Sequence, residues 1–290
     1  MAVARFDPFM RDMEHPVRPT RLGASVILLI LIVLSLAAVV PLYWMFATSL
    51  TPSAMTVKLP PELIPSEPTL DNYRTVLRQP NFGRWVLNSF IQALSVTAVT
   101  VATASMAGYA LAKLPFRGSK LLFWLFIMSM MLPFEAILVP LFLVVTRLGL
   151  VDTYLGLLLP LMVSPFSIFL MKQFIQTLPT ELLDAARVDG AGEARIFWEV
   201  VLPLVRPGLA FLGIITFVAQ WNAFVWPLVV TRSSGMRTLQ VGLVLIREQE
   251  PLFFGLHMAA AVLAAIPVIV IFFAFQRYFL RGVTVGALKG

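Results

Sequence analysis

Residues 184–203 read DAARVDGAGEARIFWEVVLP and lie between two apolar runs that are each long enough to cross a membrane. Charged residues make up only 13% of the chain, yet six of these twenty positions are ionisable. The six are Asp184, Arg187, Asp189, Glu193, Arg195 and Glu199. Because charged side chains are costly in lipid, the segment is predicted to lie outside the bilayer.

The composition predicts an all-α, polytopic membrane protein. Hydrophobic residues form 59% of the chain, and the mean hydropathy is +0.88. The apolar runs are about 20 residues long, which suits membrane-spanning helices and is too long and uniform for barrel strands. Six spans are predicted: Ala24–Phe46, Trp85–Leu111, Leu121–Val145, Thr153–Ile175, Pro207–Val230 and Leu256–Phe279.

Several classes of site are excluded. The absence of cysteine rules out disulfides and thiolate metal sites, and the two histidines, His15 and His257, are too far apart in sequence to suggest a metal site. The net charge of +7 is attributed to cations on the cytoplasmic side of a membrane and not to nucleic-acid binding.

An even number of spans places both termini on one side. The short loop that carries Lys113, Arg117 and Lys120 contains no acid, and basic residues are more frequent on the side of the N-terminus, which predicts cytoplasmic termini. The first span is too long for a signal peptide and is expected to be retained. The resulting division is a cytoplasmic segment 1–23, a transmembrane domain 24–279 with a cytoplasmic loop 179–206, and a cytoplasmic tail 280–290.

The cytoplasmic loop is predicted to form two short helices lying along the membrane. Thr180 is expected to cap the first helix, and Gly190 with Gly192 to end it. Pro203 and Pro207 are expected to end the second helix, which begins near Glu193. Its apolar face consists of Ile196, Phe197, Val200 and Val201. The competing interpretation is an amphipathic connector resting on lipid headgroups.

The same loop resembles a motif of a known family. Asp184-Ala185-Ala186, then Gly190, then Val200-Val201-Leu202-Pro203, is similar to the EAA loop of ATP-binding cassette (ABC) importer permeases. Every spacing is kept, with aspartate and valine in place of the usual glutamate and isoleucine. Residues 69–73 and 281–290 are similar to those of the carbohydrate-uptake subfamily, in particular its smaller maltose-type permease.

The resemblance implies a type I ABC importer permease fold and a subunit that is not an enzyme. The expected partners are a second permease, two copies of a cytoplasmic ATP-binding subunit that hold ATP and Mg²⁺, an extracytoplasmic sugar-binding protein and membrane lipid, in a bacterial or archaeal inner membrane. The chain itself lacks the G-x-x-x-x-G-K-[ST] phosphate-binding motif. The coupling residues implied by the family are Asp184, Ala185, Ala186, Arg187, Gly190, Leu202, Pro203 and Lys289.

Polar residues inside the spans predict a substrate path. At 1.5 Å per residue, Glu135 in the third span and Gln220, Trp221 and Asn222 in the fifth all lie about 20 Å from the cytoplasmic ends. Asn88 enters from the outer end of the second span. Amides and aromatic rings at one depth would suit a sugar, although such amides also join membrane helices to one another.

Three alternatives remain open. A proton-coupled secondary transporter would use Glu135 as its proton site, but would not need the loop at 184–203. A membrane enzyme would need a cluster of catalytic or metal-binding groups, which the sequence lacks. An ABC importer for glycerol phosphate would favour buried cations in the spans, and none is present.

Overall fold

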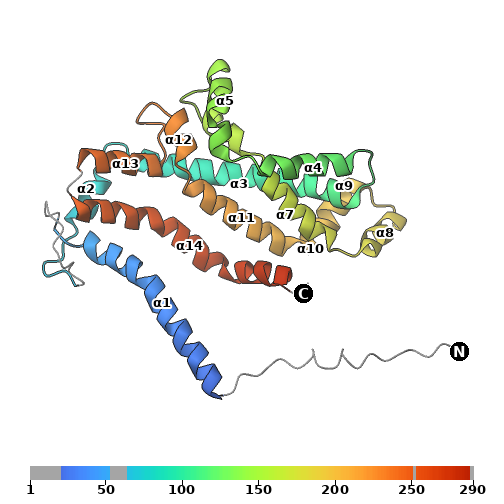
Figure 1. Ribbon diagram of the computed structural model, residues 1–290. Coiled ribbons are helices and arrows are strands. Elements are labelled where there is room, and N and C mark those ends of the chain that lie inside the picture. Colours follow the sequence, from blue (N-terminus) through green and yellow to red (C-terminus); the bar gives the residue numbers. More distant parts are fainter. Residues whose placement is uncertain (1–20, 53–63, 251–252, 288–290) are drawn as a thin grey trace.

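The computed structural model describes residues 21–52, 64–250 and 253–287, and all regular elements in these ranges are helices (Figure 1). The prediction of an all-α protein is confirmed. The elements are α1 (Arg21–Ser49), α2 (Asp71–Leu77), α3 (Phe82–Lys113), α4 (Ser119–Met130), α5 (Phe134–Arg147), α6 (Tyr154–Leu158), η2 (Leu159–Leu161), α7 (Pro165–Gln176), α8 (Thr180–Val188), α9 (Glu193–Ile196), η3 (Phe197–Val201), α10 (Leu202–Leu204), α11 (Arg206–Trp221), α12 (Val225–Val230), α13 (Leu239–Gln249) and α14 (Phe254–Ala287).

Helices α3, α7, α11 and α14 form the centre of the molecule (Figure 1). Two glycines allow close packing there. A Cβ added to Gly108 of α3 would lie 2.9 Å from the backbone nitrogen of Lys172 in α7, and one added to Gly208 of α11 would lie 2.7 Å from the ring of Phe174. The absence of a side chain at these positions lets the helices approach closely, as is common between membrane helices.

The spans are less regular than the sequence predicts. Within the described residues, three helices are long and apolar enough to cross a membrane: α1, α3 and the first part of α14. Three more candidate spans are bent pairs, namely α4 with α5 (101°), α6–η2 with α7 (44°), and the segment α9–α10 with α11 (77°). Six spans are reached only if each bent pair counts as one, so the predicted number is neither contradicted nor confirmed.

Prolines account for the first two of these breaks, as expected from their missing N–H groups. Pro133 precedes the first residue of α5, and Pro165 is the first residue of α7. Pro140 lies inside α5. The predicted fifth span, Pro207–Val230, is not one continuous helix, because α11 stops at Trp221 and residues 222–224 separate it from α12.

Helix α1 leans away from the rest of the molecule (Figure 1), and no side chain in its most apolar 18 residues is buried. Leucine, isoleucine and valine cover its whole circumference. A helix that is apolar on every side needs an apolar surrounding, which lipid or another membrane subunit supplies.

Candidate functional site

The loop between α7 and α11 forms a ledge at one end of the bundle, at the far end of α3 from α2 and α13 (Figure 1). We call α8, α9, η3 and α10 the coupling ledge. Helix α8 begins at Thr180, and Pro179 precedes it without a side-chain cap, so the predicted Thr180 cap is wrong by one residue. Pro203 lies within α10 and does not end the second segment, which continues to Leu204.

Gly190 ends α8 as predicted. Its φ of +83° is in the left-handed region, which glycine adopts at little cost. The backbone N–H of Gly190 donates to the carbonyl of Arg187 (3.0 Å), and that of Ala191 donates to the carbonyl of Ala186 (3.0 Å). These two bonds form a Schellman motif, which fixes the direction in which the chain leaves the helix.

One arginine joins the two halves of the ledge. Arg187 Nη1 donates to Asp184 Oδ1 (2.7 Å) within α8, and Arg187 Nε donates to Glu193 Oε1 (2.9 Å) at the start of α9. Hydrogen bonds from Arg187 and then Tyr109 hold the pKa of the Glu193 carboxyl below its usual value, while Glu193 and Asp184 raise the pKa of Arg187. Arg187 and Glu193 are therefore both charged at neutral pH.

A second contact ties the ledge to the membrane helices. The hydroxyl of Tyr109, near the end of α3, donates to Glu193 Oε2, and Lys113 Nζ donates to the carbonyl of Leu178 (2.6 Å) just before α8. Sequence reasoning missed Tyr109 and the role of Glu193. The only local signal was the charge of Glu193 beside Gly192, since its partner Tyr109 lies 84 residues away.

The ledge has one buried and one exposed face. Leu183, Ile196 and Val201 are completely buried among α3, α7 and α11, which confirms the predicted apolar face of the second segment. On the other side, Val188 is 87% exposed and Trp198 is 66% exposed. Asp184 and Ala185 are exposed, whereas Ala186, Leu202 and Pro203 are partly buried. Lys289 lies outside the described residues.

We expect Glu193→Gln to destabilise the ledge at neutral pH, because it removes the charge shared by Arg187 and Tyr109. The pKa of Glu193 is lower in the folded state than the ordinary value of 4.5. Its contribution to the free energy of unfolding is therefore complete above pH 4.5 and is lost as the pH falls through the pKa of the folded state. The midpoints of thermal unfolding of the wild type and of Glu193→Gln should therefore differ above about pH 5 and become equal in more acidic buffer. Glu181→Gln, on exposed α8, is the control, and an equal effect of the two substitutions would contradict the role of Glu193.

The residues predicted to line a substrate path occupy different environments. Asn88 is fully buried, its Nδ2 donates to the carbonyls of Gly235 (2.8 Å) and Arg237 (2.9 Å), and its Oδ1 accepts from the hydroxyl of Tyr154 (2.7 Å). Trp221 is 1% exposed, and its Nε1 donates to the carbonyl of Ala264 (2.9 Å). Both side chains are fully engaged in holding helices together, as in the competing interpretation.

The remaining path residues are more accessible. Gln220 accepts a hydrogen bond from Gln92 Nε2 (3.2 Å), and Asn222 is exposed, with its Nδ2 bonded to the carbonyl of Val218 (2.9 Å). Glu135 is exposed in the first turn of α5. It follows the 101° bend at the end of α4, so counting along a straight helix does not give its depth. A substrate role for Gln220, Asn222 and Glu135 stays a prediction.

Metal-dependent chemistry has no visible site in the described part of the chain, where no three His, Asp or Glu side chains are grouped to hold an ion. The arrangement can instead transmit force. The exposed face of the coupling ledge is open to another subunit, and its buried face and the contact of Tyr109 with Glu193 join it to three membrane helices.

Residues 101–285, which include the whole coupling ledge, match the family described as binding-protein-dependent transport system inner membrane component. The chain belongs to this family. The permease family predicted from the EAA-like loop is thus confirmed, and with it the location in an inner membrane. A chain in the crystal structure of a bacterial ABC transporter involved in the import of the acidic polysaccharide alginate has the same fold, with a TM-score of 0.79 and 25% identity over 91% of this permease and 99% of that chain.

Two curated permeases are similar along most of their length. The arabinooligosaccharides transport system permease protein AraQ of Halalkalibacterium halodurans is 38% identical over 256 residues, which are 87% of this permease and 92% of AraQ. The sn-glycerol-3-phosphate transport system permease protein UgpE of Yersinia pestis is 36% identical over 262 residues, which are 88% of this permease and 93% of UgpE.

Proposed function

We propose that this permease is one membrane half of an ATP-driven importer that takes up a sugar delivered by an extracytoplasmic binding protein. The coupling ledge carries the proposal. Its exposed side offers Val188, Trp198 and Ala185 to a cytoplasmic ATP-binding subunit, which would hold ATP and Mg²⁺. Asp184, Arg187 and Gly190 would set the angle of α8 in that contact, while Leu202 and Pro203 would join the ledge to α11.

The exposed apolar surface and the similar permeases indicate the remaining partners, namely lipid, a second permease and the transported substrate. The exposed apolar part of helix α1 and the bent pair α4–α5 are surfaces for lipid and for a second, different permease subunit. Two copies of the ATP-binding subunit would serve the two permeases. AraQ, and the alginate importer whose chain shares this fold, favour an oligosaccharide as the substrate.

Isolation of the permease from its native membrane is the direct test. A mild-detergent preparation of the tagged chain should contain a second permease and an ATP-hydrolysing subunit, and cells without the chain should lose uptake of labelled oligosaccharide. Transport by the purified chain alone, in vesicles without any ATPase, would overturn the proposal and favour a proton-coupled transporter.

The orientation is tested separately with single cysteines. The chain contains no cysteine, so a single cysteine introduced at a chosen position is the only thiol of the chain. We expect Glu181→Cys, exposed in the first turn of α8, to react with a membrane-impermeant maleimide only after the cells are opened. Ser233→Cys, exposed on the loop before α13, should react in intact cells. The reverse pattern would place the ledge outside the cell and end the coupling role.

A second candidate substrate is sn-glycerol 3-phosphate, because UgpE is 36% identical to this permease. Against it, the described spans carry their lysines and arginines near their ends, so this chain offers a phosphate no cation in mid-membrane. Uptake of labelled glycerol phosphate and of labelled arabinooligosaccharide by the same cells, with and without the permease, distinguishes the two substrates.

A further inference from the structure

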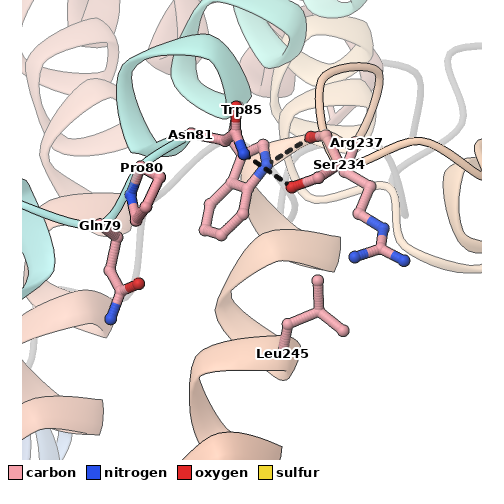
Figure 2. Close-up of a pocket in the computed structure, with 7 residues that line it drawn as sticks. All are labelled: Gln79, Pro80, Asn81, Trp85, Ser234, Arg237 and Leu245. Atoms are coloured by element: carbon pink, nitrogen blue, oxygen red, sulfur yellow. Dashed lines mark hydrogen bonds between the residues drawn. The ribbon is translucent and has the colours of Figure 1, made fainter.

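A pocket of about 230 Å³ lies at the end of the molecule opposite the coupling ledge. The turn between α2 and α3, the loop before α13, and α13 itself surround it (Figure 2). Its lining combines apolar and polar side chains: Gln79, Pro80, Asn81, Trp85, Ser234, Arg237 and Leu245. None of these residues belongs to the predicted coupling site or substrate path.

The loop that carries Ser234 and Arg237 is held firmly by α3 and the turn before it. Trp85 Nε1 donates to the carbonyl of Ser234 (2.8 Å), and Asn81 Nδ2 donates to Ser234 Oγ (2.9 Å). Asn88 binds the carbonyls of residues 235 and 237, as described above. A loop fixed by several side chains loses little entropy on binding, so the pocket is preorganised for a ligand.

Two polar groups of the lining make no side-chain hydrogen bond to another residue in the part of the chain that the structure describes. The guanidinium of Arg237 and the amide of Gln79 extend past the Trp85 ring at opposite sides of the pocket (Figure 2). Among the ion pairs of the described residues, none involves Arg237. The guanidinium of Arg237 lies on the same side of the Trp85 ring as Leu245 (Figure 2), and a guanidinium favours a carboxylate, which it can bind through two parallel hydrogen bonds.

The pocket is poorly suited to a sugar. The ring of Trp85 is only 5% exposed, and α13 lies so close that a Cβ on Gly242 would be 2.2 Å from it. The ring face therefore has no room for the C–H face of a sugar. Arg78 and Arg84 are exposed on the α2–α3 side of the pocket and attract an acidic group, whereas the exposed acids Glu248 and Glu250 lie at the end of α13.

We propose that this pocket receives an aspartate or glutamate side chain of the binding protein when that protein docks on the outer face of the permease. The inference rests on the proposed function, because the outer position of the pocket depends on the inner position of the ledge. Arg237 pairs with the incoming carboxylate, and the anchored loop keeps its backbone in place before docking.

The test uses the complete importer in vesicles and the binding protein that copurifies with it. We expect Arg237→Gln to raise the binding-protein concentration that gives half-maximal ATPase stimulation by about tenfold or more, and Arg237→Glu to raise it further. Stimulation at saturating binding protein should stay near the wild-type level. Arg232→Gln, exposed in the same loop but outside the pocket lining, is the control and should change this concentration less than about twofold.

The possible results either support or overturn the pairing of Arg237 with an acidic residue of the binding protein. Rescue of Arg237→Glu by a lysine in place of one acidic residue of the binding protein would establish the pair. Equal effects of the Arg237 and Arg232 substitutions would overturn the inference. It would also be overturned if Arg237→Gln left the half-maximal concentration of binding protein unchanged and instead altered the preference of the importer for anionic sugars. If the wild-type importer shows no stimulation by any binding protein, the proposed function itself fails. Arg237→Lys, which keeps the charge without the planar fork, should fold normally and bind with intermediate affinity.

Discussion

Gly190→Val is expected to reduce substrate transport to about a tenth or less while ATP hydrolysis by the assembled importer continues. Gly190 has a φ of +83°, where a β-carbon is strained by about 1–2 kcal/mol and a β-branched side chain by more. Each 1.4 kcal/mol is about a tenfold change in an equilibrium. The strain would open the Schellman motif and change the angle of α8, although space around a new Cβ is free.

Gly192→Val provides a matched control. Gly192 lies two residues away, a Cβ there also meets nothing within 4 Å, and its φ of −71° suits any residue. Gly190→Asn should retain most of the activity, because asparagine tolerates left-handed angles better than other side chains. Uptake of labelled substrate and phosphate release are measured on the same vesicles. Equal loss of uptake in the two valine variants would show that the backbone angle of Gly190 is not what matters.

Gly108→Val is expected to prevent most of the protein from folding. The new Cβ would lie 2.9 Å from the Lys172 nitrogen and 3.0 Å from the carbonyl carbon of Met171, both backbone atoms of α7. Because these atoms belong to a helix, relief requires α3 and α7 to move apart. Overpacking of this kind costs about 1–3 kcal/mol or more. Separation of the two helices would also disturb the cluster that contains Leu183 and Ile196 of the ledge.

The yield of monodisperse protein and its midpoint of thermal unfolding measure this effect. Gly83→Val is the control, since Gly83 lies on the same helix, is exposed, and has no atom within 4 Å of an added Cβ. The control should behave as the wild type does. Normal yield and an unchanged midpoint for Gly108→Val would mean that α3 and α7 do not pack as closely as described.

The coupling ledge was largely predictable because its signals are local. Gly190 must supply a left-handed turn, and the apolar spacing of Ile196, Phe197 and Val201 marks one helix face, so sequence and structure agree there. The contact between Tyr109 and Glu193 joins residues 84 positions apart, and no periodic pattern reports such a pair.

The substrate path was less predictable for a related reason. Asn88 was assigned to the path from its polarity and depth alone. Its partners are carbonyl groups up to 149 residues away, on a loop whose position only the folded chain defines. The depth of Glu135 was counted along a straight helix, whereas α4 and α5 meet at a 101° bend that contains Pro133. Counting residues gives the depth of a side chain in the membrane only where the helix axis is straight.

Helix α3 links the coupling ledge to the pocket at the opposite end of the molecule. It runs unbroken for 32 residues, or about 48 Å, and carries Tyr109 at one end and Trp85 with Asn88 at the other. A tilt of this one rod moves both ends together. If the proposed ATP-binding subunit and binding protein act on its two ends, a nucleotide state that raises the affinity for the binding protein by some factor must itself be favoured by that protein by the same factor, because thermodynamic linkage is reciprocal.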